Sequence, residues 1–283
     1  MTHPKKKLAL VIGSGAVKCA AALGLWQVLN RAGIEIDLYV GCSGGSLYAA
    51  VMALGLSAEE CIEKTKSLWN RSVTKRRNWR SLLQTILPGV LGFDEFFGMV
   101  DDRPLLRNLE KAFGERTFSE TRRPLHVVAT NLLDGEQVVI SDGRLVDALR
   151  ASISIPYIWP AWRIGDQTLV DGSLVNPLPI DVAILEGAEI ILAMGFESPY
   201  PHRIKSISRY AFHINSIMTN NLLRANFAFH NLAHHAEILT LLPEFDKPVR
   251  LFDTDEFSYV IDKGAKAAEE QLPYLVRLLE TAG

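Results

Sequence analysis

The sequence lacks an excess of charge of either sign. Its 30 lysines and arginines oppose 32 aspartates and glutamates, which gives a net charge of −2. A protein that binds nucleic acid over a broad surface carries a basic excess, so we expect no nucleic-acid partner. Cysteine is also scarce: three in 283 residues are too few for a disulfide framework and indicate a reducing compartment.

A membrane-spanning run is missing as well, because residues 48–56, among the longest apolar stretches, are far shorter than a span needs. The N-terminus imitates a signal peptide, with lysines at 5–7 ahead of the apolar residues 8–17. However, Lys18 occupies the place where a small residue would precede cleavage, and a helical pattern continues beyond it. We therefore expect a soluble, cytoplasmic protein.

Short apolar runs alternate with helical patterns over the first two thirds of the chain. They predict strands at residues 8–12, 37–40, 125–129, 137–140, 168–170 and 189–196, and helices at 18–31, 46–54, 105–113 and 180–185. This alternation predicts an α/β fold with a mostly parallel sheet flanked by helices. From about residue 203 a long helix, a strand at 238–242 and a closing helix near 263–279 follow without a linker. We expect a core of residues 8–196 and a mainly helical C-terminal extension, 197–283, packed on the same domain.

Residues 41–45, Gly-Cys-Ser-Gly-Gly, fit the pattern G-x-S-x-G at the turn from a predicted strand into a predicted helix. Gly41 and Gly45 are small enough for a sharp turn, which would project the Ser43 hydroxyl at the helix N-terminus. Free N–H groups and the positive end of the helix dipole favour a developing oxyanion there. The pattern alone also fits an ordinary glycine-rich turn, but its place between strand and helix favours a serine nucleophile.

A serine nucleophile needs a base, and the sequence offers two kinds. Three of the seven histidines, His230, His234 and His235, cluster at helical spacing, which is more typical of a solvated or packed helix. Asp171, in Leu-Val-Asp-Gly-Ser, directly follows an apolar strand, a common place for an active-site carboxylate. Such a carboxylate can accept the serine proton if burial raises its basicity. Asp171-Gly172 by itself fits a simple turn equally well.

Residues 13–18, Gly-Ser-Gly-Ala-Val-Lys, lie between the first predicted strand and helix. Small residues there expose backbone N–H groups to an oxyanion or a phosphate. The loop is close to the dinucleotide-binding pattern G-x-G-x-x-G, and Glu35 or Asp37 stands about 20 residues on, as that pattern requires. Lys18, however, replaces the third glycine, and a nucleotide site leaves Ser43 and Asp171 without a role. A dinucleotide-binding Rossmann protein is therefore the rival interpretation.

These three motifs, in this order, resemble the patatin-like phospholipase family. In that family a glycine-rich loop precedes a G-x-S-x-G nucleophile, and a later Asp-Gly-Gly or Asp-Gly-Ala holds the second catalytic residue. The similarity extends from about residue 8 to residue 196. Residues 151–156 with Pro160 resemble the segment before the family's aspartate. The block Asp171-Gly172-Ser173 with Asn176 and Pro177 resembles the family's segment around that aspartate. Residues 129–131 and 134–135 stand where the family has a strand and a turn.

The resemblance implies a three-layer α/β/α fold and a Ser43–Asp171 dyad, without histidine, that hydrolyses lipid acyl esters through an acyl-enzyme. The oxyanion hole would use the backbone N–H groups of Gly15 and Ala16. Lys18 matches the family's basic residue in the loop. The residues that would support the motifs are Gly13, Ser14, Lys18, Gly41, Gly45 and Gly172. We expect no cofactor and no metal ion.

The family's loop reads G-G-G-x-R/K-G, whereas residues 14–19 of this chain read Ser-Gly-Ala-Val-Lys-Cys. Ala16 replaces a glycine and resists the positive φ that glycine would accept, and Cys19 replaces the last glycine, so a side chain must be packed there. Ser173, in place of glycine or alanine, is a milder departure. The dyad is intact, so the departures concern the efficiency of the oxyanion hole. They keep open a non-catalytic or weakly active member with a lipid-binding or regulatory role.

The stretch from residue 64 to residue 80 has seven basic side chains and no acidic one, with Trp69 and Trp79 beside its densest part, and the apolar residues 82–93 follow. Such a combination can dock on an anionic bilayer or form a lid over an acyl site. It equally fits a solvated basic helix beside an ordinary core segment. We expect a lipid or acyl-ester substrate and a peripheral membrane contact through residues 64–93.

A catalytic triad that uses His235, as in an α/β-hydrolase, is the remaining alternative, although Ser43 comes unusually early in the chain for the α/β-hydrolase fold.

Overall fold

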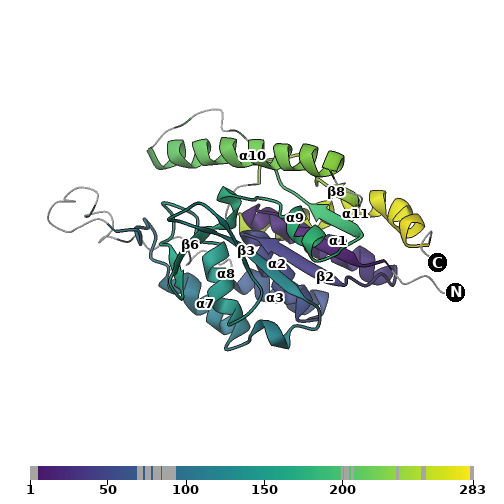
Figure 1. The fold of residues 1–283 in the computed structure, drawn as a ribbon, viewed down its shortest axis with the longest axis horizontal. Coiled ribbons are helices and arrows are strands. Elements are labelled where there is room, and N and C mark those ends of the chain that lie inside the picture. Colours follow the sequence, from purple (N-terminus) through teal and green to yellow (C-terminus); the bar gives the residue numbers. More distant parts are fainter. Residues whose placement is uncertain are drawn as a thin grey trace.

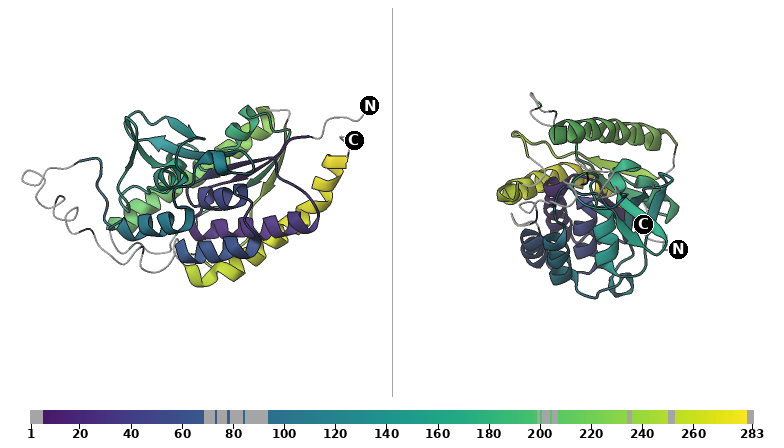
Figure 2. Two further views of the ribbon diagram at one scale, coloured as in Figure 1. Left: turned by 90° about the horizontal axis from the view of Figure 1, so that it is seen from below. Right: turned by 90° about the vertical axis from the view of Figure 1, so that its left-hand side faces the viewer.

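An eight-stranded mixed sheet runs through the described part of the molecule, with helices on both of its faces (Figures 1 and 2). The structure is a computed structural model that describes residues 6–68, 73, 78, 84, 94–198, 200, 204, 207–233, 236–249 and 253–280. The strands are β1 (Leu8–Ile12), β2 (Leu38–Cys42), β3 (Leu125–Asn131), β4 (Gln137–Ile140), β5 (Trp162–Ile164), β6 (Gln167–Asp171), β7 (Ile190–Met194) and β8 (Glu237–Leu241). Their order is β5-β6-β3-β2-β1-β7-β8, and β4 pairs with β3.

The sheet is mostly parallel, as the sequence predicts. Strands β3, β2, β1, β7 and β8 are parallel neighbours, whereas β4 and β6 run antiparallel to β3, and β5 runs antiparallel to β6. Strands β1, β2 and β7 are buried along their whole length, because helices on both faces leave neither side in water. The carboxyl ends of the parallel strands meet at one edge of the sheet, and the motifs that follow β1 and β2 therefore lie together.

Two hydrophobic clusters, one on each face of the sheet, make up the core. Along β1 the residues alternate, so that Leu8, Leu10 and Ile12 join one cluster and Ala9 and Val11 the other. The larger cluster holds residues of α1 (Ala21–Arg31), α2 (Gly44–Ala53), α3 (Ala58–Leu68), α7 (Arg103–Phe113), α8 (Leu145–Ser152) and α11 (Phe257–Glu280). The smaller holds residues of α9 (Ile180–Leu185) and α10 (Ile207–Ala233). This is a three-layer α/β/α arrangement.

Most of the predicted elements are confirmed. Strands β1 and β4 and helix α9 have the predicted bounds, and the predicted first helix begins as a 3-10 turn at Ala16–Ala20 before α1. Helix α8 and strand β5 were not predicted. Helix α8 begins without a side-chain cap. Strand β5 has only three residues, none of them buried, which are too few for the alternation of a strand to be recognised.

The described elements beyond position 196 pack on the same domain. Strand β8 pairs in parallel with β7 along its whole length. Helix α11 lies along α1 (Figure 2), and a Cβ atom on Gly24 of α1 would lie 2.0 Å from the Ile261 carbonyl oxygen of α11. The glycine therefore lets the two helix backbones touch. The division of the chain at residues 196 and 197 stays a prediction.

The segment predicted to contact a membrane, residues 64–93, lies mostly outside the described residues, and so do the side chains of His230, His234 and His235. Among the basic residues of that segment, Lys64 lies on α3, where its Nζ donates a hydrogen bond of 2.9 Å to the Ala112 carbonyl. The membrane contact itself stays a prediction. Of the helices that the structure describes, none combines the length and the apolar character needed to cross a bilayer.

Candidate active site

Ser43 lies at the turn between β2 and α2, where the sequence places it. Its backbone has φ 53° and ψ −131°, a region that costs a residue with a side chain about 1–3 kcal/mol. Hydrogen bonds hold this conformation on both sides. The Ser43 N–H donates to Ser152 Oγ at 2.9 Å, and the Ser43 carbonyl accepts from Ser46 Oγ at 2.6 Å and from the Ser46 N–H at 3.0 Å.

The glycines around Ser43 are required by close backbone contacts. A Cβ atom on Gly45 would lie 2.2 Å from the Ile12 carbonyl oxygen, and one on Gly41 would lie 2.4 Å from the Ser46 Cα. The end of β1 and the first turn of α2 therefore cross without room for a methyl group. This agrees with the sequence argument that a sharp turn at this point needs small neighbours.

Asp171 reaches Ser43 from the other side of β3. In the sheet register Cys42 is level with Val128, and Asp171 of β6 is level with Ala129, so Ser43 and Asp171 come to similar heights on either side of β3. The Ser43 Oγ donates a hydrogen bond of 2.6 Å to Asp171 Oδ2. Because β6 runs antiparallel to β3, the aspartate comes to this edge from the opposite direction to the serine.

The carboxyl group of Asp171 is buried and has strong partners. It is 1% exposed, and its Oδ1 accepts a second hydrogen bond, of 2.9 Å, from the Ser173 N–H. Burial raises the pKa of Asp171 from its usual 3.8 to about 6, and the hydrogen bonds from Ser43 and Ser173 oppose part of this rise. At neutral pH the group is an ionised carboxylate that is more basic than one in water, as proton transfer from a serine requires.

The glycine-rich loop is tied to β7 and to the segment that follows Asp171. The Gly13 N–H donates to the Met194 carbonyl at 2.9 Å, and the Ser14 N–H donates to the Pro177 carbonyl at 2.8 Å. A Cβ atom on Gly44 would lie 2.8 Å from the Cα of Ala16, so the loop passes directly over the N-terminus of α2. The structure thus brings the predicted oxyanion loop, the serine and the aspartate to one place.

The departures from the family's loop at Ala16 and Cys19 have structural consequences. Ala16 adopts φ 50°, a conformation that costs a residue other than glycine about 1–2 kcal/mol. Cys19 is fully buried, and its Sγ donates a hydrogen bond of 3.3 Å to the Gly13 carbonyl. Burial raises the pKa of the Cys19 thiol above its usual range, so the thiol is neutral and fills the space as a packed side chain.

Lys18 is buried at the end of the same loop. Its Nζ donates a hydrogen bond of 2.5 Å to the Glu197 carbonyl, and burial lowers the pKa of Lys18 to about 8. It therefore ties the loop to the segment that follows β7. A cavity of about 620 Å³ opens beside it. The other lining residues are Glu197, Ser198, Tyr200, Arg224, Pro243, Phe245, Asp246, Lys247, Pro248 and Val249.

The block after Asp171 is fixed by close contacts and amide hydrogen bonds. A Cβ atom on Gly172 would lie 2.4 Å from the Val128 carbonyl oxygen, so this position accepts only glycine without a shift. The Asn176 Nδ2 donates to Gln137 Oε1 at 2.8 Å and to Asp181 Oδ1 at 2.7 Å, and its Oδ1 accepts from Asn226 of α10 at 2.9 Å. The resemblance pointed to Asn176, and the structure gives it a role in packing α9 and α10 against this block.

Sequence reasoning assigned no role to the polar residues that surround the pair. Ser152, Ser154 and Thr130 are all buried. The Ser154 carbonyl accepts from the Asp171 N–H at 3.0 Å, and Thr130 Oγ1 donates to the Asp171 carbonyl at 2.9 Å. The usable signal was the pair of serines in residues 151–156, which stand in an otherwise apolar segment.

The positions of Glu35 and Asp37 rule out the dinucleotide-binding interpretation of the glycine-rich loop. Glu35 and Asp37 both precede β2, at the edge of the sheet opposite to the glycine-rich loop. Glu35 pairs with Arg123 at 2.7 Å, and Asp37 accepts from the Leu8 N–H at 3.0 Å. Neither carboxylate can therefore reach a ribose bound at that loop.

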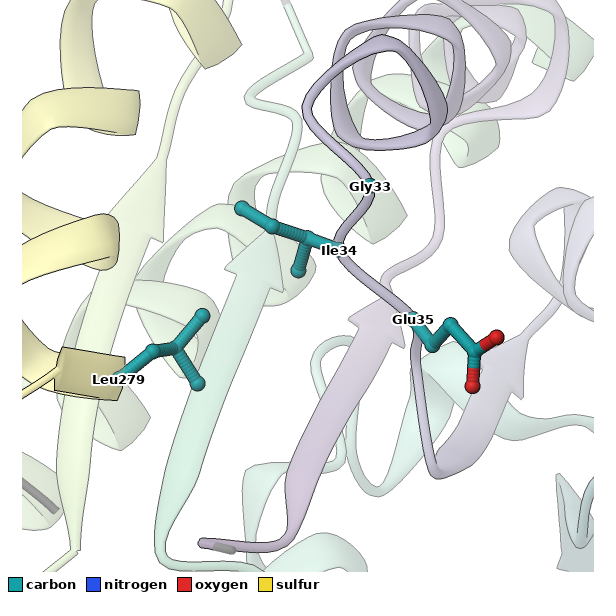
Figure 3. A pocket seen from close by; sticks show the side chains of 4 residues that line it. All are labelled: Gly33, Ile34, Glu35 and Leu279. Carbon is teal, nitrogen blue, oxygen red and sulfur yellow. The ribbon is translucent and has the colours of Figure 1, made fainter. Parts of the chain in front are cut away.

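A second hollow, of about 330 Å³, is also at that opposite edge (Figure 3). Gly33, Ile34 and Glu35 of the loop before β2 and Leu279 near the end of α11 line it. Figure 3 shows the Glu35 carboxylate pointing away from Leu279. The hollow takes no part in the site around Ser43.

The described residues hold no cluster of histidine, cysteine or acidic side chains that could bind a metal ion.

The sequence is similar to those of known proteins. The family profile described as patatin-like phospholipase matches residues 10–184. An uncharacterized NTE family protein of Mycobacterium tuberculosis is 30% identical over 177 residues, which are 62% of this chain and 28% of that protein. Human patatin-like phospholipase domain-containing protein 6 is 27% identical over 190 residues, 66% of this chain and 13% of that protein. The chain thus matches less than a third of the length of either relative.

Two solved structures share the fold. VipD from Legionella pneumophila has a TM-score of 0.52 at 12% identity, over 96% of this chain and 67% of that one. Human GIVD cytosolic phospholipase A2 has a TM-score of 0.53 at 9% identity, over 98% of this chain and 62% of that one. At such low identity the likeness concerns the fold alone.

Proposed function

The chain belongs to the patatin-like phospholipase family, and we propose that it is a serine lipid acyl hydrolase, a carboxylic ester hydrolase that uses Ser43 as nucleophile and Asp171 as base. The observation that carries the proposal is the 2.6 Å hydrogen bond from Ser43 Oγ to a buried carboxylate. Within the described residues the partner of this hydroxyl is an aspartate, which favours a two-residue mechanism over a histidine triad.

In the first half of the reaction, Asp171 Oδ2 takes the hydroxyl proton while Ser43 Oγ attacks the acyl carbonyl carbon. The carbonyl oxygen becomes an oxyanion, and we assign its stabilisation to the backbone N–H groups of Gly15 and Ala16. The intermediate then collapses: the bond from the acyl carbon to the alcohol oxygen breaks, and Asp171 returns its proton to the leaving alkoxide. An acyl ester on Ser43 remains.

The second half repeats these steps with water. Asp171 takes a proton from the water as its oxygen attacks the acyl carbon of the Ser43 ester, and the same N–H groups bind the second oxyanion. Breakage of the bond to Ser43 Oγ releases a carboxylic acid, and the proton on Asp171 passes back to the serine. One water is consumed, one acid and one alcohol form, and neither a metal ion nor a cofactor takes part in the proposal.

The substrate we propose is a lipid acyl ester. The cavity of about 620 Å³ beside the glycine-rich loop falls in the size range of small-ligand sites, and we assign it to the part of the substrate nearest Lys18.

We also propose that residues 64–93 contact an anionic membrane surface. Vesicle sedimentation tests this contact: binding that rises with the anionic lipid fraction and falls with salt supports it, and binding independent of both contradicts it.

Kinetics of the two dyad variants test the activity. With acyl-ester substrates from p-nitrophenyl esters to lysophospholipids, we expect Ser43→Ala and Asp171→Asn each to lower kcat by about a thousandfold or more. The double variant should be no slower than the single ones, because the two residues act as one unit. Folded wild-type protein that is inactive on every acyl ester, with vesicles or detergent present, would instead indicate a lipid-binding or regulatory protein.

A further inference from the structure

We propose that Ser152, the last residue of α8, is a positioning residue that holds the Ser43 backbone in the conformation in which its hydroxyl meets Asp171. The inference rests on the proposed function. Ser152 is fully buried and makes no hydrogen bond to the hydroxyl of Ser43 or to the carboxyl group of Asp171. Its contact is with the Ser43 N–H, through a hydrogen bond of 2.9 Å to Ser152 Oγ.

The direction of this hydrogen bond is set by a second one. The Ser152 hydroxyl donates its own proton to the Val128 carbonyl of β3 at 2.7 Å, so its oxygen is left as an acceptor for the Ser43 N–H. Ser152 therefore connects three elements: the turn after β2, the end of α8 and the middle of β3. Rotation of this buried hydroxyl would break its hydrogen bonds to Val128 and Ser43, so Ser152 Oγ acts as a fixed acceptor.

The Ser43 conformation needs such support. A residue with φ 53° and ψ −131° persists only where its surroundings hold it there. The Ser46 bonds hold the carbonyl side of Ser43, and Ser152 holds the N–H side. Without Ser152, the peptide before Ser43 is free to turn toward an unstrained conformation, and this rotation would carry Oγ away from Asp171.

The segment that carries Ser152 is itself firmly held, and it also touches the aspartate. Arg150 is fully buried, with Nη2 2.6 Å from Asp102 Oδ2 and Nη1 2.6 Å from Ser154 Oγ. The Ser154 carbonyl accepts the Asp171 N–H at 3.0 Å. Ser152 at the end of α8 and Ser154 just beyond it thus each bond to the backbone N–H group of one dyad residue, so this one segment fixes the separation of the two.

The first test is the kinetics of Ser152→Ala on a p-nitrophenyl acyl ester. We expect kcat to fall by about 100-fold, the order of loss that follows a displacement of about 1 Å at a reacting atom. The KM should change by less than about twofold, because Ser152 has no place in substrate binding. Thr121→Val is the matched control: Thr121 is another hydroxyl that donates to a carbonyl, that of Phe118 at 2.7 Å, and it lies before β3, outside the hydrogen bonds of the dyad.

The second test reads the position of Ser43 without any turnover. The hydrogen bond from Ser43 lowers the pKa of Asp171, so its loss in Ser152→Ala should raise that pKa above about 6. The other titratable groups that act on Asp171 are the thiols of Cys19 and Cys42. Burial raises the pKa of both, so both stay neutral through this pH range. The carboxyl signal of Asp171 in carbon-13 NMR, assigned with Asp171→Asn, gives the titration.

A lower kcat with an unchanged KM and a higher Asp171 pKa, both absent from Thr121→Val, support the positioning role. A kcat like that of the control, or an Asp171 titration equal to that of the wild type, overturns it. If Ser152→Ala does not fold, Ser152→Cys replaces it: a thiol is a weak acceptor, so kcat should still fall at least about tenfold, and a wild-type kcat overturns the role. If the wild type itself proves inactive, the proposed function fails, and the NMR titration still decides the role of Ser152.

Discussion

Replacement of Asp171 by asparagine should stabilise the folded protein at neutral pH while it removes the base. The carboxyl group is fully buried, and its pKa rises from 3.8 to about 6 on folding. As the pH rises from 3.8, the unfolded chain releases this proton before the folded protein does, so the free energy of unfolding decreases. Above pH 6 the decrease is complete and amounts to about 3 kcal/mol.

Asparagine has the same shape and no charge to bury. Its Oδ1 can keep the bond from the Ser173 N–H, and its Nδ2 can donate to Ser43 Oγ, which then acts as acceptor. We therefore expect Asp171→Asn to raise the free energy of unfolding by up to about 3 kcal/mol at pH 8 and by less than about 1 kcal/mol at pH 4. Urea unfolding at the two pH values measures both differences.

Ser43→Ala separates this effect from the loss of activity. It should be as inactive as Asp171→Asn, but it keeps the buried carboxylate and takes away one of its hydrogen bonds, so it should be no more stable than the wild type at pH 8. An Asp171→Asn variant that is no more stable than the wild type at pH 8 would refute the reasoning. So would a gain of equal size at pH 4 and pH 8, because it could not come from ionisation.

Two further predictions follow from the same contacts. For a neutral ester substrate, kcat/KM should rise with pH and level off above the Asp171 pKa of about 6, because the base must be ionised to accept the serine proton; a profile that is flat from pH 4.5 to pH 8 would contradict Asp171 as the base. Gly45→Ala should lower the free energy of unfolding by about 3 kcal/mol, since its Cβ would lie 2.2 Å from the Ile12 carbonyl oxygen; unchanged urea unfolding would show that the crossing of β1 and α2 is looser than described.

Sequence alone could predict the features that depend on local patterns. The strands β1 and β4 and the turn at Ser43 follow from short apolar runs and from glycines, which act over a few residues. Asp171 is different, because Asp-Gly after a strand is equally a turn, and only its order relative to Ser43 and the glycine-rich loop singled it out. The hydrogen bond between residues 43 and 171 depends on the sheet register, which no local pattern contains.

The partners of the supporting residues were beyond prediction for a related reason. Ser152 bonds to residues 43 and 128, which are distant along the chain. No local sequence pattern at the end of a helix predicts which distant residues a serine will bond to. The positive φ of Ala16 is the opposite case: sequence reasoning noted that alanine resists it, and the structure adopts it nonetheless. Here the contacts of the loop with β7 and with the segment after Asp171 outweigh a local preference.

The most direct test of the central claim, that Ser43 is an activated nucleophile, is intact mass after treatment with a fluorophosphonate. The wild type should gain a single adduct, and Ser43→Ala, folded equally well, should gain none. Asp171→Asn should react much more slowly, because its serine keeps the proton. Wild-type protein that stays unlabelled in the presence of detergent or anionic vesicles, or an adduct that persists in Ser43→Ala, would contradict the account.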